Sequence, residues 1–249
     1  MEMNYIRFGE GNKTMVILPG LSLKPIADSA KAVIDAYQVF AKDYTVWLFE
    51  RRADMKENYT IEQMAEDTIR KIEELGLKDL YLFGVSQGGM IAQYICLKRN
   101  DLIRKLVLAS TTFRFPEDRT DEWLQLAEEK KTGKLVRSFS KMIYSDAFYR
   151  KYRHLLPLMY GNLSEEEKRR FLICAKACIG FDLSNSIDRI EVPTLILGSK
   201  KDRIISFEDM IEMNRRIPGS DLYLYEGYAH AVYDEAPDFK ERILNFFAK

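Results

Sequence analysis

The chain has 249 residues, of which 38 are basic and 38 acidic, so its formal net charge at neutral pH is zero. This length suffices for one α/β domain with a small insertion, and we expect one main core. The charges form no long run of either sign, which gives no reason to expect a nucleic acid or an anionic membrane as partner. The expected partner is a small molecule, and the sequence does not distinguish a monomer from a homodimer.

Targeting signals and cysteines indicate the compartment. The N-terminal residues lack the basic and apolar regions of a signal peptide, and no stretch approaches 18 consecutive apolar residues. Cys96, Cys174 and Cys178 cannot all pair with one another, which is typical of a reducing compartment. We therefore expect a cytoplasmic protein without a membrane span. Cys174 and Cys178 would share a helix face, but no second pair completes a metal site, so we interpret them as small apolar core residues.

Short apolar runs alternate with helix-like segments over the first 112 residues. Residues 61–75 show the clearest helical periodicity, with a capping box at Thr60 and a stop at Gly76. The predicted strands of this part are 16–18, 45–50, 79–85 and 105–109, and further helices are predicted over 26–40 and after residue 86. This alternation predicts an α/β fold with a largely parallel sheet and crossover helices.

The alternation stops between about residues 113 and 188, where helical segments rich in charge and in Tyr, Phe and Met follow one another without a convincing strand. It then resumes with predicted strands 194–198 and 222–225 and predicted helices 206–217 and 237–247. We therefore expect a core made of residues 1–112 and 189–249, with residues 113–188 as a helical insertion.

The sharpest chemical signal is Gly84-Val85-Ser86-Gln87-Gly88, a G-x-S-x-G motif at a predicted strand-to-helix junction. A strand that turns directly into a helix leaves no room for side chains two positions before and after the turn residue, so glycine fits there. Such a turn exposes the serine hydroxyl at a helix N-terminus, where backbone N–H groups favour an anion. Ser86 is the candidate nucleophile; the alternative is an ordinary Gly-rich turn.

A serine hydroxyl needs a base, and the chain has two histidines. His154 lies within the helical insertion, where an exposed or structural role explains it. His230 follows the last predicted strand, and such loops carry the sites of open α/β sheets. We therefore favour His230 as the base. Asp202, in the loop after predicted strand 194–198, is the best candidate for the acid that orients it, although an isolated loop aspartate is usually a turn former or helix cap.

These motifs resemble the α/β-hydrolase fold superfamily, in the branch with a helical cap inserted before the strand that carries the acid. The matching stretches cover nearly the whole chain: 16–20, 83–89, 192–198 with Asp202, and 227–230. The resemblance implies a mostly parallel sheet with helices on both faces, a Ser86, Asp202 and His230 triad in the family's chain order, and an oxyanion hole formed by the backbone N–H groups of Leu21 and Gln87.

The chain departs from the family pattern at two points. Pro19-Gly20 stands where many members carry His-Gly before the first oxyanion donor. Glu50-Arg51-Arg52 stands where many carry an Asp-x-Arg-Gly-like turn, and we interpret these three residues as a solvated ion-pair cluster, with substrate contact as the alternative.

Together these features predict acyl transfer from a small to medium, largely apolar carboxylic ester, with no cofactor because all reacting groups belong to the protein. A carbon–carbon bond hydrolase or an aminopeptidase of the same fold is the alternative enzyme, and a non-catalytic ligand-binding protein is the alternative class. The insertion would supply apolar surface for the acyl pocket and for its own packing on the core: Trp123, Leu124, Phe139, Met142, Ile143, Phe148, Tyr149, Leu156, Met159 and Tyr160.

Overall fold

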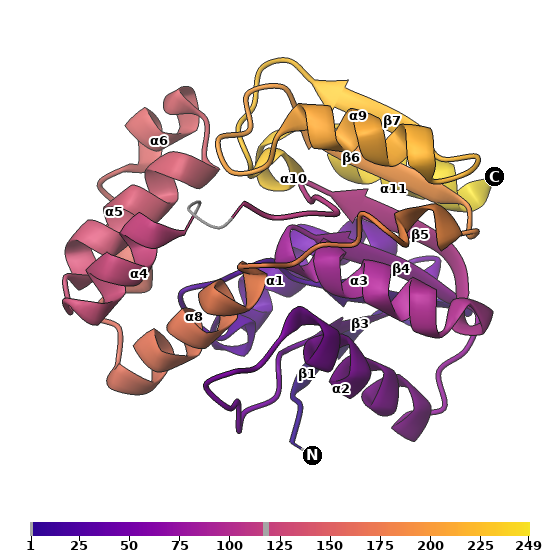
Figure 1. Ribbon diagram of the computed structural model, residues 1–249, viewed down its shortest axis with the longest axis horizontal. Helices are drawn as coiled ribbons and strands as arrows, with labels where there is room; N and C mark the ends of the chain where they lie inside the picture. Colours follow the sequence, from indigo (N-terminus) through magenta and orange to yellow (C-terminus); the bar gives the residue numbers. More distant parts are fainter. Residues whose placement is uncertain (1, 117–119) are drawn as a thin grey trace.

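The computed structural model describes residues 2–116 and 120–249 and contains a seven-stranded sheet (Figure 1). Its spatial order is β1-β3-β2-β4-β5-β6-β7, in which β1 runs antiparallel to β3 and every other neighbouring pair is parallel. The strands are β1 (Tyr5–Phe8), β2 (Lys13–Leu18), β3 (Tyr44–Phe49), β4 (Leu80–Val85), β5 (Ile103–Ala109), β6 (Thr194–Ser199) and β7 (Asp221–Tyr225).

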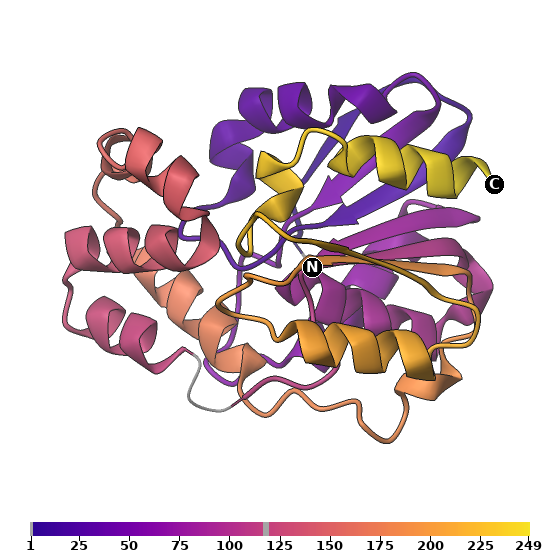
Figure 2. The same ribbon diagram turned by 90° about the horizontal axis from the view of Figure 1, so that it is seen from above.

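Helices connect the strands and cover both faces of the sheet. The helices are α1 (Ala30–Tyr37), α2 (Ile61–Glu74), α3 (Gln87–Lys98), α4 (Asp121–Glu128), α5 (Thr132–Ile143), α6 (Asp146–Tyr152), α7 (Leu156–Tyr160), α8 (Glu165–Cys178), α9 (Phe207–Arg216), α10 (Val232–Glu235) and α11 (Phe239–Ala248). Figure 2 shows α1 and α11 on one side of the sheet and α9 on the other. The mostly parallel α/β architecture predicted from the alternation is therefore confirmed.

Successive side chains of a strand point to opposite faces, and β4 shows how this divides the core into two layers. Leu80 and Leu82 belong to the apolar cluster that includes α2, α3 and α9, whereas Tyr81 and Phe83 belong to the cluster beneath α1 and α11. All four side chains are buried. A strand buried on both faces reads as a continuous apolar run, which is why the sequence predicts β4 so clearly.

In the described part of the chain, the α-helices α4 to α8 lie between β5 and β6. Figure 1 shows α4, α5 and α6 to the left of the sheet, with α8 leading back toward it. The isolated bridge between Arg114 and Asp182 closes the base of this segment. Phe139 stacks edge-on against Trp123 and Phe171, which joins α5 to α4 and α8. These aromatic contacts bury the apolar surface that the sequence offers here.

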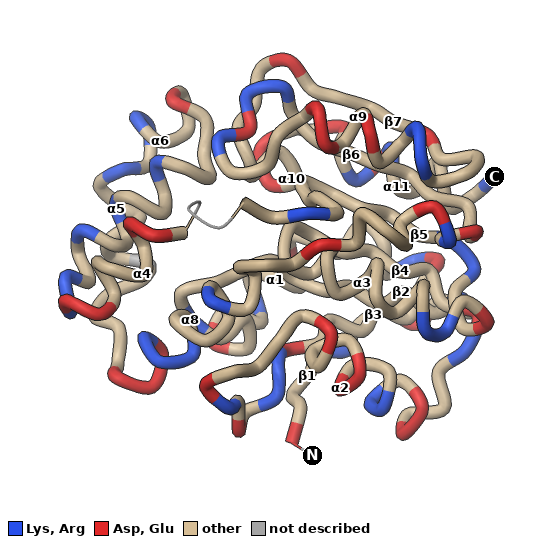
Figure 3. Tube along the Cα trace, viewed as in Figure 1, with Lys and Arg blue, Asp and Glu red and all other residues tan. Residues whose placement is uncertain are grey.

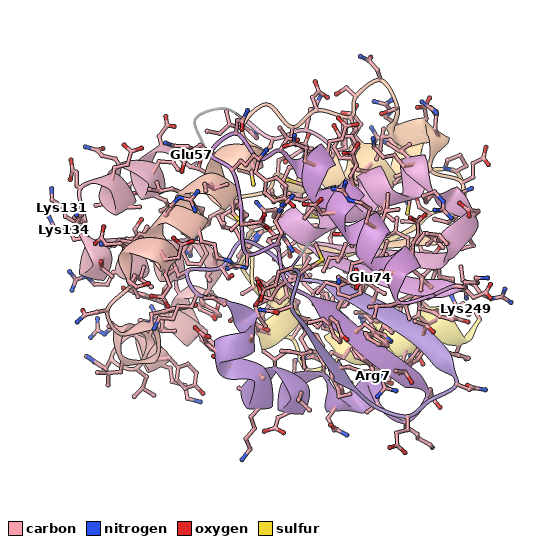
Figure 4. All side chains as sticks on the ribbon, turned by 90° about the horizontal axis from the view of Figure 1, so that it is seen from below. Arg7, Glu57, Glu74, Lys131, Lys134 and Lys249 are labelled. Carbon is pink, nitrogen blue, oxygen red and sulfur yellow. The ribbon has the colours of Figure 1, made fainter. Side chains whose placement is uncertain are left out.

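The surface carries interspersed acidic and basic residues (Figure 3), as the cancelling charges of the sequence imply. Figure 4 shows the labelled Lys131 and Lys134 at the outer end of the helical segment and Lys249 at the far end of the molecule. Among the residues that the structure describes, no helix is both long and apolar enough to cross a membrane.

Candidate active site

Ser86 occupies the turn between β4 and α3 with a backbone φ of 51° and ψ of −119°, a conformation that non-glycine residues rarely adopt. The glycines on either side make this turn possible. A Cβ added at Gly84 would lie 2.6 Å from the carbonyl oxygen of Gly88, and one added at Gly88 would lie 2.0 Å from that of Leu18. Both distances are far inside van der Waals contact, so the strained turn depends on glycine at both positions.

His230 follows β7 in a loop whose backbone carbonyls accept hydrogen bonds from serine hydroxyl groups. The Oγ of Ser110, at the end of β5, donates a hydrogen bond of 2.7 Å to the backbone carbonyl of His230. The Oγ of Ser199, at the end of β6, donates to the backbone carbonyls of Tyr225 and Tyr228 in the same connection. Three neighbouring strands therefore fix the backbone that carries the imidazole.

Asp202 lies in the loop after β6, with its side chain fully buried. One carboxylate oxygen, Oδ1, accepts the backbone N–H groups of Ile204 at 2.8 Å and Ile205 at 2.9 Å. The other, Oδ2, lies 2.8 Å from Nδ1 of His230. Both carboxylate oxygens are therefore held by hydrogen bonds, which fixes the side chain beside the imidazole.

The structure brings the three predicted residues into one chain of contacts. Nε2 of His230 lies 3.0 Å from Oγ of Ser86, and His230 is only 3% exposed. These distances are within the range of a nucleophile, base and orienting acid before substrate binds. His154 is exposed and lies between α6 and α7, outside this arrangement, which agrees with the exposed one of its two interpretations.

The predicted oxyanion donors lie on two segments next to Ser86. Gln87 is the first residue of α3, a position whose N–H has no partner within its own helix. The turn formed by Pro19, Gly20 and Leu21 passes so close that a Cβ on Gly20 would lie 3.2 Å from Cβ of Ser86. Leu21 and Gln87 line the same cavity as Ser86. The turn therefore lies beside Ser86 although Pro19 replaces the histidine of the family pattern.

This cavity is narrow, about 40 Å³, and mainly apolar. Ser86 and His230 open onto it, and its apolar lining includes Met90, Phe115, Trp123, Phe139, Ile143 and Ile204. Of the ten insertion residues considered from the sequence, Trp123, Phe139 and Ile143 line it. Six others are not among the residues that line the cavity: Leu124, Met142, Phe148, Tyr149, Leu156 and Tyr160. The side chain of Met159 lies outside the described residues.

The interpretation of residues 50–52 as a solvated ion-pair cluster is wrong for its first two members. Glu50 is 6% exposed and Arg51 is 7% exposed. Glu50 pairs with Arg170 of α8 at 2.5 Å and accepts the backbone N–H groups of Ile26 and Ala27. Only Arg52, which pairs with the exposed carboxylate of Asp54, fits the original interpretation. The approach of α8, which the sequence does not locate, buries the other two.

Sequence reasoning also missed the hydroxyl groups that support the site. Ser110 and Thr111 are buried at the carboxyl end of β5, and Oγ1 of Thr111 donates to the backbone carbonyl of Ser86 at 2.8 Å. The sequence did contain a signal, because Ser110, Thr111 and Thr112 directly follow the predicted strand 105–109, which ends in four apolar residues. Small hydroxyl residues at such a strand end are suited to hold neighbouring loops.

The three cysteines are buried free thiols, and Cys174 and Cys178 belong to the apolar core, as predicted. Cys178 also lines the cavity. Over residues 2–116 and 120–249, no cluster of three or more His, Cys, Asp or Glu side chains is placed to hold a metal ion.

A strand-to-helix turn that carries a serine, with a histidine and an aspartate on later strand ends, defines an architecture shared with known proteins. The family model for the α/β-hydrolase fold matches residues 19–237. The chain belongs to this family, and it is a hydrolase of this fold.

Individual relatives are similar to this chain over most of its length. RutD of Agrobacterium fabrum, whose name describes it provisionally as a carbamate hydrolase, is 26% identical over 75% of this chain and 74% of its own. The 3-oxoadipate enol-lactonase 1 of Acinetobacter baylyi is 21% identical over 80% of this chain and 74% of its own. Among solved structures, the α/β-hydrolase MGS-M2 from a deep-sea metagenome superimposes with a TM-score of 0.88 at 21% identity, covering 99% of this chain and 94% of that one.

Proposed function

We propose that this protein is a serine hydrolase that cleaves a small to medium, largely apolar carboxylic ester through an acyl-enzyme. The observation that carries the proposal is the continuous contact from Ser86 Oγ to His230 Nε2 at 3.0 Å, and from His230 Nδ1 to Asp202 at 2.8 Å, at the wall of an apolar cavity. Ser86 attacks the carbonyl carbon while His230 takes the hydroxyl proton, and Asp202 stays ionised beside the imidazolium.

The negative charge that develops on the carbonyl oxygen needs donors that are already in place. The backbone N–H groups of Leu21 and Gln87 fill this role in the proposal, because both residues border the cavity beside Ser86. His230 then returns its proton to the leaving alcohol. A water molecule, deprotonated by His230, attacks the acyl-enzyme; His230 then returns that proton to Oγ of Ser86 as the bond to the acyl carbon breaks and the carboxylic acid leaves.

The cavity supports a short apolar acyl group. About 40 Å³ has room for a few water molecules or a short acyl chain, and its walls are mostly aliphatic and aromatic. Trp123, Phe139 and Ile143 come from α4 and α5. We propose that residues 113–188 act as a lid over the core formed by 1–112 and 189–249, so that the lid sets acyl specificity.

The names of the relatives add three further candidate substrates to the esters. Their names describe a carbamate hydrolase and an enol-lactonase, both of which cleave a bond at an acyl carbon. Another relative, from a Pseudomonas species and 24% identical over 72% of this chain, is named a 2-hydroxy-6-oxononadienedioate/2-hydroxy-6-oxononatrienedioate hydrolase. A lactone, a carbamate and 2-hydroxy-6-oxononadienedioate therefore belong in the substrate panel beside simple esters.

The test is hydrolysis of p-nitrophenyl esters from acetate to octanoate by the wild type and by Ser86→Ala. We expect turnover with short acyl chains and a loss of several orders of magnitude in kcat in the variant, which should fold normally. Retained turnover by a folded Ser86→Ala protein would overturn the assignment of Ser86. A wild type that neither hydrolyses the panel nor reacts with a fluorophosphonate would favour a non-catalytic binding protein.

A further inference from the structure

Arg51 is buried behind the predicted oxyanion hole and contacts both of the segments that form it. Its Nη2 donates a hydrogen bond of 2.7 Å to the backbone carbonyl of Pro19, which begins the turn that ends at Leu21. The same nitrogen lies 3.3 Å from the side-chain Oε1 of Gln87. A single guanidinium nitrogen therefore contacts the turn that leads to Leu21 and the side chain of Gln87, the two residues whose backbone N–H groups are the proposed donors.

The side chain of Gln87 is held from its other end by α8. Its Nε2 donates to the backbone carbonyl of Cys174 at 2.5 Å and to Sγ of Cys178 at 3.2 Å. Gln87 is 1% exposed, so these bonds form out of contact with solvent. Pro19, Arg51, Gln87 and α8 thus form one buried hydrogen-bonded chain behind Ser86.

Stability alone does not account for a charge at this position. Burial lowers the pKa of Arg51, because desolvation disfavours the guanidinium cation. Within the described part of the chain its Nε has no hydrogen-bond partner, and the nearby carboxylate of Glu50 pairs with Arg170. A buried cation with an unsatisfied N–H is costly, and an apolar side chain of similar volume is often more stable.

Arg51 also has no room to bind a substrate group. The cavity at Arg51, which Gly20, Glu50 and Arg170 also line, measures about 10 Å³. This is close to the lower limit for one water molecule. The guanidinium therefore acts on neighbouring protein atoms and not on a ligand.

We propose that Arg51 is a positioning residue that fixes the N–H groups of Leu21 and Gln87 at the spacing required by the tetrahedral oxyanion. This inference rests on the proposed function. Donors to a developing charge are effective only when they are held in advance of the reaction, and a misplacement of about 1 Å costs roughly 100-fold in rate. Arg51 holds both donor segments through one nitrogen atom, so its removal releases both.

The test compares Arg51→Met, Arg51→Lys and Gln87→Leu with the wild type. Arg51→Met removes both hydrogen bonds. Arg51→Lys keeps the charge, but its ammonium group ends nearer the backbone than the outer guanidinium nitrogen, and Gln87→Leu removes only the side-chain links. The matched control is Arg52→Met, since Arg52 is the neighbouring arginine and pairs with Asp54 and Asp67 instead.

We measure kcat and KM on the best p-nitrophenyl ester, and inhibition by a trifluoromethyl ketone and by the product carboxylic acid. The ketone forms a tetrahedral oxyanion with the serine, whereas the acid binds without one. In Arg51→Met we expect kcat to fall roughly 10- to 100-fold, with KM within about twofold of wild type. Arg51→Lys and Gln87→Leu should show smaller losses of kcat. Ketone affinity should fall in parallel with kcat, acid affinity should not change, and Arg52→Met should behave as wild type.

Wild-type kcat in folded Arg51→Met or Arg51→Lys would overturn the proposal, as would equal weakening of ketone and acid. If Arg51→Met does not fold, Arg51→Lys and Gln87→Leu decide the question. A wild type that hydrolyses no ester and is not labelled by a fluorophosphonate would instead refute the proposed function, which separates the two failures.

Discussion

Asp202 faces His230 with one carboxylate oxygen and holds its own loop with the other. Oδ2 lies 2.8 Å from the imidazole Nδ1, while Oδ1 accepts the backbone N–H groups of Ile204 and Ile205. The carboxylate is therefore fixed before substrate arrives. This arrangement favours the histidine tautomer that carries its proton on Nδ1 and leaves Nε2 free to accept the proton of Ser86.

Asp202→Asn tests this arrangement with little change in shape. The amide oxygen can still accept the two loop N–H groups, which places the amide NH₂ opposite Nδ1 and favours the wrong imidazole tautomer. We expect kcat to fall about 10⁴-fold, the size of effect known for this change in a serine protease triad, with little loss of folding stability. Ester hydrolysis and thermal unfolding measure the two effects. Asp238→Asn, at an aspartate paired with Arg242, is the control and should retain kcat.

Gly88→Ala tests the packing that permits the strained turn. The new Cβ would lie 2.0 Å from the carbonyl oxygen of Leu18 and 2.6 Å from that of Pro19, both rigid backbone atoms. We expect the free energy of unfolding to fall by about 1–3 kcal/mol, and activity to be lost because the turn must shift. Denaturant titration measures the change in stability.

Gly133→Ala is the matched control for this substitution. Gly133 lies in the first turn of α5, and a Cβ added there would meet no atom within 4 Å. Alanine has the higher helix propensity, so we expect a gain of up to about 0.5–1 kcal/mol in unfolding free energy. Equal effects at Gly88 and Gly133 would contradict the described packing of the turn.

Trp123→Leu tests whether the helical segment sets acyl length. Trp123 is 3% exposed and lines the cavity, so a smaller side chain enlarges the space beside Ser86. We expect the ratio of kcat/KM for octanoate to that for acetate to rise about 10-fold or more. Leu158→Ala, at a side chain that is 76% exposed, should leave the ratio unchanged. An unchanged ratio in folded Trp123→Leu would place the acyl group elsewhere.

Cys178 lines the cavity but should not react with alkylating reagents near neutral pH. Burial raises the pKa of this thiol to about 12. Since the thiolate is the reactive form, the group is almost wholly protonated at pH 8 and becomes more reactive only as the pH rises toward its pKa. We expect iodoacetamide at pH 8 to leave ester hydrolysis intact. Rapid inactivation that disappears in Cys178→Ala would contradict this expectation.

The sequence predicted the strands buried on both faces and the helices with a strong apolar stripe. Residues 61–75 and 79–85, for example, correspond to α2 and β4 within one residue at each end. It did not predict β1, because a strand of four residues, YIRF, at the edge of the sheet has too few positions to show a periodicity. The final predicted helix, 237–247, corresponds to α11, whereas the four-residue α10 before it was not predicted.

The proximity of Ser86, Asp202 and His230 could be predicted because each follows a recognisable strand, and parallel strands end at the same edge of a sheet. The burial of Glu50 and Arg51 could not be predicted, because it depends on α8, which lies more than 100 residues later in the chain. Local charge patterns describe a solvated surface unless another element covers it. The residues that line the cavity could not be predicted from the sequence either. Helical periodicity identifies the buried face of a helix but does not show which part of that face meets the core.

The most direct test of the proposed chemistry is mass spectrometry of the intact protein and its peptides after reaction with a fluorophosphonate. We predict one adduct per chain on the peptide that contains Ser86, no adduct in Ser86→Ala, and strongly slowed labelling in His230→Ala, since the imidazole must take the hydroxyl proton. An adduct on another residue, or none on a folded wild-type protein, would contradict the assignment of Ser86 as an activated nucleophile.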